Sequence, residues 1–186
     1  MKIGLIGEAP LDTLSIKCLL SKKFPNLEYI ELLKNKFTGC SLENQKTKTE
    51  IRIECITHRP DIVIFIRDLD GLATPYYRDK ILLRKTYFND FKGSTLCKKT
   101  IYLLHIWEIE SLIFSDLNAF NKFYDTDLQQ NLISYHIENP KEELYKLHRK
   151  YSNSDNLKIF EYSNFDTIYN ENIYFKKFID EFQKLI

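Results

Sequence analysis

Five acidic residues stand just beyond apolar runs of the sequence. The acidic residues are Glu8, Asp68, Asp70, Glu108 and Glu110, and the apolar runs before them are residues 2–6, 62–66 and 100–106. In an open parallel sheet, ligands bind beyond the carboxyl ends of the strands. If these runs are strands of one such sheet, the carboxylates gather at one edge of it. Carboxylates gathered in this way bind hard divalent cations.

The Asp-Leu-Asp-Gly segment is the most specific of these patterns. Asp68 and Asp70 lie two positions apart at the end of the run 62–66, and alternate side chains of a strand share a face. We therefore expect both carboxylates to reach one cation. Mg²⁺ suits this arrangement, because it prefers oxygen ligands and is usually held by one or two carboxylates together with substrate phosphates.

Several competing catalytic motifs are absent from the sequence. It contains no GxxxxGK[ST], so the Lys-Gly-Ser-Thr segment at residues 92–95 is not a phosphate-binding loop, and it contains neither GxGxxG nor GxSxG. The four histidines lie far apart, and each is better explained as a packed or surface residue than as a general base. His105 is the exception that could take part in catalysis, because it lies in the run 100–106, which Glu108 follows closely.

Strand-like runs alternate with amphipathic stretches as far as Asp116. The predicted strands are residues 2–6, 27–33, 62–66 and 100–106, and the predicted helices are residues 12–24, 42–58, 76–91 and 107–114. The β-branched and aromatic run at 62–66 is typical of a strand buried on both faces, so we expect it at the centre of the sheet. Asp12 or Thr13 is expected to cap the first helix, and Pro25 is expected to stop it.

The chain changes character after Asp116. Helical pieces rich in Tyr, Phe and Asn follow, including residues 140–151 and 172–186, and only residues 158–162 resemble a strand. The apolar stripe of residues 172–186 is better explained by core packing than by a ligand role. We predict an α/β fold with a mostly parallel, Rossmann-like sheet of about four strands in residues 1–116. Residues 117–186 are expected to form a helical C-terminal extension packed on that domain and not an independent domain.

Composition sets wider limits on the protein. Apolar residues make up 44% and charged residues 28% of the chain, which is typical of a globular protein. The net charge of +1 neither indicates nor excludes binding to nucleic acid. No apolar stretch approaches the roughly 20 residues that span a bilayer, and Glu8 ends the first apolar run early, so we expect a cytoplasmic protein without membrane contact. The cysteines are well separated, which favours reduced thiols over a zinc site; they are Cys18, Cys40, Cys55 and Cys97.

Two segments of the chain resemble the Toprim domain, which topoisomerases, primases, small recombination factors and the overcoming-lysogenization-defect nucleases share. One is Ile-Gly-Glu-Ala-Pro-Leu-Asp, which contains Glu8 and Asp12, and the other is Ile-Phe-Ile-Arg-Asp-Leu-Asp-Gly, which contains Asp68 and Asp70. The later Trp-Glu-Ile-Glu segment, with Glu108 and Glu110, resembles uncharacterised bacterial Toprim families related to those nucleases. The pair Pro140-Lys141 is similar to a pair in their following helix. The resemblance covers residues 1–116 and implies a Toprim-like fold.

The resemblance also implies an activity. In Toprim enzymes the glutamate after the first strand acts near the scissile phosphate or holds metal, and the Asp-x-Asp acids bind Mg²⁺. It therefore implies a Mg²⁺- or Mn²⁺-dependent nuclease for DNA or RNA, with two ions held by a set of carboxylates. The implied metal ligands are Glu8, Asp12, Asp68, Asp70, Glu108 and Glu110, and the implied catalytic residues are Glu8, Asp68, Asp70 and Lys141.

Glu108 and Glu110 cannot both face the same way on a helix, because residues two apart diverge by about 200°. We expect Glu110 to point inward, and Glu108 to act as a metal ligand at the strand end or to support one. Lys141 could neutralise charge that develops at the phosphate, although a surface lysine at a helix start explains it slightly better.

Two other interpretations stay open. Asp-Leu-Asp-Gly also resembles the nucleophile motif of haloacid-dehalogenase-like phosphatases, but about 60 residues precede it here, whereas that fold normally opens with the motif. The chain could also be a catalytically idle Toprim-like interaction module. Many relatives of the nucleases work with a separate ABC-type ATPase in bacterial antiphage defence, so we expect such a partner and a role as the effector subunit. A homo-oligomer remains an alternative.

Overall fold

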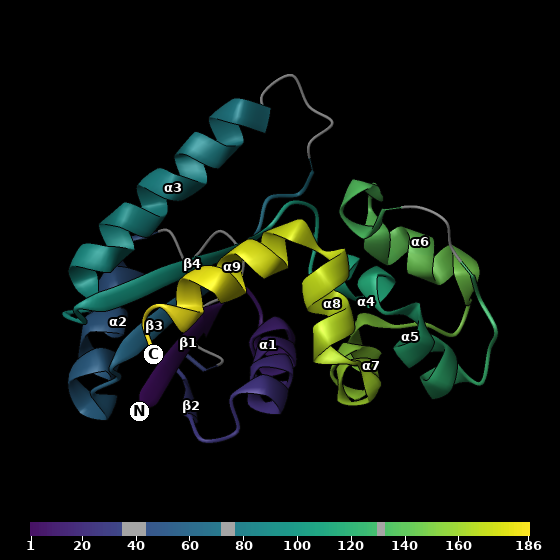
Figure 1. Cartoon of the computed structure of the whole chain (residues 1–186). Helices are drawn as coiled ribbons and strands as arrows, with labels where there is room; N and C mark the ends of the chain where they lie inside the picture. Colours follow the sequence, from purple (N-terminus) through teal and green to yellow (C-terminus); the bar gives the residue numbers. More distant parts are fainter. Residues whose placement is uncertain (35–43, 72–76, 130–132) are drawn as a thin grey trace.

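A computed structural model describes residues 1–34, 44–71, 77–129 and 133–186 of the chain, and the side chains of residues 77–79 are not described. A parallel four-stranded sheet with helices on both faces forms its centre (Figure 1). The strands are β1 (Lys2–Gly7), β2 (Glu28–Glu31), β3 (Ile62–Asp68) and β4 (Lys99–His105), in the order β2-β1-β3-β4. This confirms the predicted α/β class. No helix of the described residues is long and apolar enough to cross a membrane.

The register of the strands brings their carboxyl ends to one edge. β3 pairs with β1 through Gly7 opposite Ile66 and with β4 through Asp68 opposite His105. The chain therefore leaves β1, β3 and β4 on the same side of the sheet. The acids after these strands start from neighbouring positions, although they are separated by up to about 100 residues of sequence.

One face of the sheet is covered by α2 (Gln45–His58) and α3 (Tyr77–Ser94). Val63 and Phe65 of β3 pack there against Ile51 of α2 and Phe91 of α3. Asn44 begins α2, because its side-chain oxygen accepts a hydrogen bond from the Thr47 amide at 2.9 Å.

The opposite face is covered by α1 and by the C-terminal helices. Their bounds are α1 (Pro10–Lys23), α4 (Ser111–Ser115), α5 (Leu117–Tyr124), α6 (Pro140–Leu147), α7 (Asn156–Tyr162), α8 (Phe165–Glu171) and α9 (Ile173–Gln183), with short 3₁₀ turns η2 (Ser134–His136) and η3 (Asn153–Asp155). Ile62, Ile64 and Ile66 point into this layer from β3. Alternation along β3 therefore sends Asp68 toward α1 and Arg67 toward α3.

The core is continuous across residue 116. Phe120 of α5, Phe160 of α7 and Phe175 of α9 belong to the same buried cluster as the strand residues. The Lys22 ammonium at the end of α1 donates to the Ser163 carbonyl at 2.6 Å, and the Lys99 ammonium of β4 donates to the Leu185 carbonyl at 2.6 Å. The helical region thus shares its core with the sheet.

Three local predictions differ from the structure. Residues 158–162 belong to helix α7, whose buried residues Asn156, Ile159 and Phe160 are at helical spacing. Neither Asp12 nor Thr13 caps α1: the helix begins after Ala9, with Pro10 in its first turn, and the Thr13 hydroxyl donates to the Ala9 carbonyl at 3.1 Å. The helix predicted for residues 107–114 begins only at Ser111.

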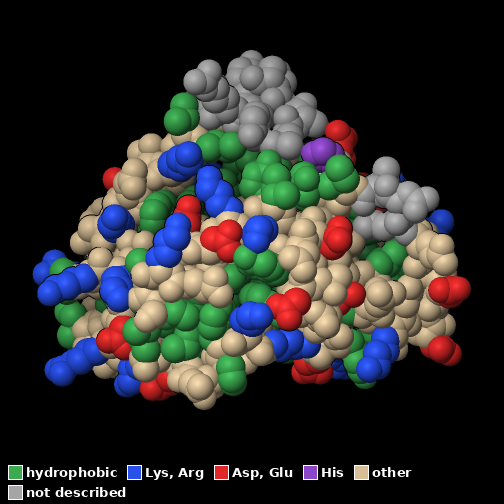
Figure 2. Space-filling view, viewed as in Figure 1, with side chains coloured by type: hydrophobic (Ala, Val, Ile, Leu, Met, Phe, Trp, Pro, Cys, Tyr) green, Lys and Arg blue, Asp and Glu red, His purple; other side chains and the backbone are tan. Residues whose placement is uncertain are grey.

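Charged side chains of both signs are interspersed on the face of the molecule that Figure 2 shows. This agrees with a net charge of +1. Recognition of a charged partner would therefore depend on local groups of side chains and not on a field of one sign.

Candidate active site

Asp68 is the last residue of β3 and lies against the α1 layer of the fold. Burial raises the pKa of Asp68 well above its usual 3.8, and the carboxylates of Asp12, Glu110, Glu8 and Glu108 raise it further. Asp68 is therefore the centre of a group of acids that repel one another. We call Asp12, Asp68, Glu108 and Glu110 the carboxylate cluster.

Asp12 enters this cluster from the first turn of α1. Burial raises the pKa of Asp12 from 3.8 to about 7, with further increases from Glu110 and Glu8, whereas Lys141 lowers it. Pro10 starts the helix immediately after the β1 edge, so Asp12 projects over the strand ends. Asp12 is the only member of the cluster that precedes β3 in the sequence.

Glu110 is 4% exposed and is held by two side chains from the C-terminal region. Its Oε1 accepts a hydrogen bond from Asn156 Nδ2 at 2.9 Å and lies 3.3 Å from the Tyr151 hydroxyl. The Tyr151 hydroxyl also lies 2.8 Å from Asn156 Oδ1. Glu110 is thus buried and fixed in orientation, while its charge still acts on Asp12 and Asp68.

Glu108 is less buried and lies at the rim of the cluster. Its Oε2 accepts a hydrogen bond of 3.3 Å from the Lys141 amide, at the start of α6. Burial raises the pKa of Glu108, Glu110 raises it further, and the amide and charge of Lys141 lower it. Lys141 therefore places its backbone and its positive charge beside the cluster.

Glu8 leaves β1 toward the other face of the sheet. Its Oε2 forms an ion pair of 2.9 Å with the Arg67 guanidinium, and Arg67 is 8% exposed. Gly7 just before it is required, because a Cβ there would lie 2.1 Å from Thr13 Oγ1. Glu8 still acts electrostatically on Asp12 and Asp68, but its carboxylate is held by an arginine.

Asp70 does not share a face with Asp68. β3 ends at Asp68, and Asp70 adopts the left-handed region with φ 57°, so the alternation expected for a strand stops there. The Asp70 side chain is 64% exposed, and its Oδ2 lies 3.8 Å from Arg84 of α3. Gly71 follows with φ 100°, where a Cβ would lie 2.1 Å from the Trp107 ring. This corrects the expectation that strand alternation aims both aspartates at one cation.

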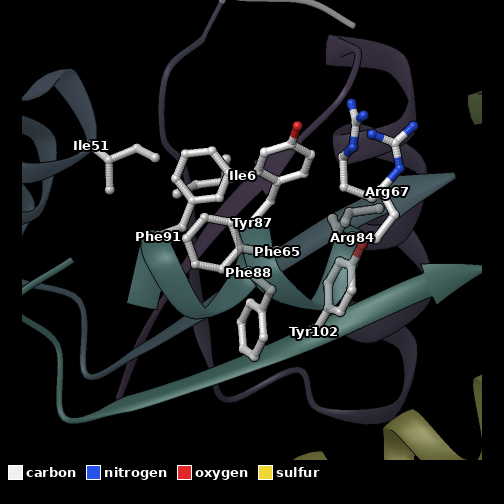
Figure 3. Close-up of a pocket in the computed structure, with 10 residues that line it drawn as sticks. Ile6, Ile51, Phe65, Arg67, Arg84, Tyr87, Phe88, Phe91 and Tyr102 are labelled. Atoms are coloured by element: carbon white, nitrogen blue, oxygen red, sulfur yellow. The ribbon is translucent and has the colours of Figure 1, made fainter. Parts of the chain in front are cut away.

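Arg67 and Arg84 line a small pocket between the sheet and α3. The rest of that pocket is apolar and aromatic, with Phe65, Tyr87 and Phe91 among its side chains. Figure 3 shows the two guanidinium groups beside each other at the end of the pocket away from Phe91. The acids Glu8 and Asp70 thus each lie beside an arginine, whereas the positive charge that acts on Asp12 and Glu108 of the carboxylate cluster is that of Lys141.

Within residues 1–34, 44–71, 77–129 and 133–186, no three Asp, Glu, His or Cys side chains are arranged to hold a metal ion. The chemistry of the cluster nevertheless fits a hard cation, because its donors are carboxylate oxygens whose mutual repulsion a cation would relieve. Of the six acids predicted as metal ligands, the structure brings Asp12, Asp68, Glu108 and Glu110 close enough for their charges to act on one another. It places Glu8 and Asp70 beside arginines.

His105 lies beside Asp68 on β4 but is fully buried. Burial lowers the pKa of His105 to about 3, so the imidazole is neutral at pH 7. An imidazole with so low a pKa is a weak base, and its burial keeps it from contact with a substrate.

Sequence reasoning missed four residues that orient the acids: Arg67, Arg84, Tyr151 and Asn156. Arg67 carries a detectable signal, since it is a charged residue inside the most apolar strand. Arg84, Tyr151 and Asn156 carry none, because ordinary polar side chains at distant positions become partners only through the fold.

Comparisons of this chain with family models, with curated proteins and with solved structures found no match.

Proposed function

We propose that this chain is a metal-dependent nuclease that hydrolyses phosphodiester bonds of DNA or RNA with Mg²⁺ or Mn²⁺. The observation that carries the proposal is the carboxylate cluster at the carboxyl edge of the sheet, where burial and repulsion raise the pKa values of Asp12 and Asp68. A protein gains no stability from buried carboxylates that repel one another, whereas a cation site requires them. The resemblance of the Glu8, Asp12 and Asp-Leu-Asp segments to Toprim enzymes supports the same activity.

The cluster would hold the cation through Asp68 and Asp12, with Glu108 at the rim and Glu110 as a fixed charge behind them. A bound Mg²⁺ supplies positive charge to a phosphate oxygen and acidifies a bound water. Lys141 stands where it can contact the negative phosphate. Arg67 holds Glu8 at the neighbouring strand end, from which the charge of Glu8 acts on Asp12 and Asp68.

The proposal includes a role beyond the single chain. A nuclease of this lineage would act as the effector of an antiphage defence system, with a separate ABC-type ATPase as partner. On the face seen in Figure 2, Lys and Arg side chains are interspersed with Asp and Glu, so that face does not favour indiscriminate binding to nucleic acid.

A cleavage assay on single- and double-stranded DNA and RNA tests this function, with the chain alone and with candidate ATPases. We expect cleavage with Mn²⁺ or Mg²⁺, no cleavage in EDTA, and at least about 100-fold less cleavage by Asp68→Asn and Asp12→Asn. Asp166→Asn is the matched control, because Asp166 is exposed and pairs with Lys23 on the surface.

Four results would contradict the proposal. Cleavage that persists in EDTA excludes the metal mechanism, and full activity in both cluster variants excludes the site. Release of phosphate from small phosphomonoesters, without cleavage of nucleic acid, would favour the haloacid-dehalogenase-like alternative. Absence of any cleavage, together with absence of Mn²⁺ binding in calorimetry, would favour the catalytically idle interaction module.

A further inference from the structure

A wide groove runs beside α6 and reaches the carboxylate cluster. Its volume is about 810 Å³. Glu108 of the carboxylate cluster and Tyr151, which contacts Glu110, line one part of it. The other lining residues include Lys141 and Tyr145 of α6 and Arg149, which follows α6. We call this hollow the α6 groove. α6 lies on the side of the molecule opposite α3 (Figure 1), so the groove is separate from the arginine pocket.

The α6 groove offers two cations that are not paired with a carboxylate of the described residues, although the charge of Lys141 also acts on Glu108 and Asp12. Among the described residues, neither the Lys141 ammonium nor the Arg149 guanidinium forms an ion pair. Lys146, the third cation of the groove, is paired with Glu143 at 2.5 Å. Two cations of the groove are therefore available to an anionic ligand.

The groove also has an exposed aromatic platform. Tyr145 is 49% exposed, and the Arg149 guanidinium lies 5.7 Å from the centre of its ring. A large apolar ring left open beside a free arginine is the arrangement that stacks nucleic-acid bases and binds the adjoining phosphates. The groove volume falls in the range of about 300–1,000 Å³ that is usual for sites of small ligands, which suits nucleotide-sized groups.

We propose that the α6 groove binds a single-stranded segment of nucleic acid next to the scissile phosphate. Tyr145 stacks on an unpaired base, and Arg149 and Lys141 contact the phosphates on either side of it. The strand then passes Glu108 into the carboxylate cluster. This inference rests on the proposed nuclease function and assigns the strand that the site receives. A base can lie on Tyr145 only when it is unpaired, so single strands are preferred to duplexes.

Binding of short fluorescent oligonucleotides, measured by anisotropy, tests the groove directly. The measurements use the full chain in EDTA and again with Ca²⁺, and each sample is checked for intact oligonucleotide. Stacking on one aromatic ring contributes about 1–3 kcal/mol, so we expect Tyr145→Ala to weaken single-strand binding by about 5-fold or more. Arg149→Ala should reduce the slope of log K against log salt by about 0.7, the value of one phosphate contact on a single strand.

The chain contains a matched control pair elsewhere. Tyr162 is 48% exposed, and the Lys122 ammonium lies 5.0 Å from the centre of its ring, yet Tyr162 does not line the α6 groove. Tyr162→Ala and Lys122→Ala should leave binding unchanged. Thermal melting of all four variants establishes that each is folded.

Each outcome bears on one proposal separately. Equal losses in both pairs, no loss in Tyr145→Ala, or tighter binding of duplex than of single strands would each overturn the groove assignment. Binding that follows the expected pattern without any cleavage would support the groove and contradict the nuclease function. Cleavage by the chain that stays unchanged in Tyr145→Ala and Arg149→Ala would support the nuclease function and contradict the groove assignment.

Discussion

Asp12 is an acid whose charge changes within the physiological range. Its pKa of about 7 means that the carboxyl is partly protonated in neutral solution, because burial and neighbouring carboxylates oppose its ionisation. Asp68 lies in the same field with a pKa shifted in the same direction. The state of these two groups therefore depends on pH and on any cation that binds to them.

Asp12→Asn should raise stability at pH 8 but not at pH 4. The unfolded chain releases the Asp12 proton near pH 3.8 and the folded chain near pH 7, so the folded state loses stability as pH rises through this window. At about 1.4 kcal/mol for each unit of pKa, the gain at pH 8 is at most about 4 kcal/mol. Urea unfolding in EDTA at both pH values measures it. Burial of His105 makes stability depend on pH in the opposite direction. This contribution is the same in the wild-type chain and in Asp12→Asn, so it cancels in the comparison.

The control for this measurement is Asp166→Asn, on the exposed end of α8. It should change the free energy of unfolding by less than about 1 kcal/mol at either pH, as surface pairs do. If Asp12→Asn raised the free energy of unfolding equally at pH 4 and pH 8, the raised pKa of Asp12 would be contradicted.

Arg67 is the second residue whose removal should have a large effect. Arg67→Met leaves the half-buried Glu8 carboxylate without its ion-pair partner, so we expect a loss of about 3 kcal/mol in the free energy of unfolding. Lys23→Met removes a pair of similar length, 2.8 Å, in which both side chains are exposed, and should cost about 1 kcal/mol or less. Chemical denaturation of both variants at pH 7 decides whether the Arg67 pair is the stronger one.

At the scale of elements, the start of α4 is tied to the start of α7. Glu110 stands at the N-terminus of α4, and Asn156, the first residue of α7, donates to it at 2.9 Å. Tyr151, between α6 and η3, completes this connection. The position of Glu110 behind the carboxylate cluster therefore depends on α7 and on the segment between α6 and η3, both of which follow it in the sequence.

Asn156→Ala should weaken both this connection and cation binding. Loss of a buried hydrogen bond to a charged group costs about 1–3 kcal/mol, and Glu110 would then be free to move away from Asp68. Asn164→Ala removes the cap of α8 instead and should cost a similar amount, about 1 kcal/mol, without changing cation affinity. Calorimetric titration with Mn²⁺ separates the two, and equal Mn²⁺ affinities in both variants would contradict the positioning role of Asn156.

At the scale of the whole molecule, the sheet and the C-terminal helices share one core. A chain ending at Asp116 would expose the faces of α1 and β4 that Phe160, Phe175 and Phe182 cover. Burial of each of these side chains contributes about 2–3 kcal/mol to the free energy of unfolding, and a marginally stable domain cannot lose that contribution three times. We expect the truncated chain to be insoluble or molten, and the full chain to unfold in a single transition followed by both near- and far-ultraviolet circular dichroism. A folded, soluble 1–116 fragment would contradict this prediction.

Local sequence was sufficient for the sheet and for the edge where the acids gather. The run Ile62–Ile66 is apolar without interruption, and only a strand covered on both faces buries all of it. Glu8, Asp68 and Glu108 follow three such runs, and parallel strands necessarily end at the same edge. These properties depend on residues close together in the chain, which is why periodicity predicts them.

Only the tertiary structure decided which way the acids point. Asp70 turns away from Asp68 because the amides of Asp70 and Gly71 bind the carbonyls of Trp107 and Ile106, which lie beyond the end of β4. Glu110 is fixed by Tyr151 and Asn156, more than 40 residues later in the chain. The direction of a side chain at a strand end is set by partners from distant segments, and packing of the helices on the sheet determines which segments those are.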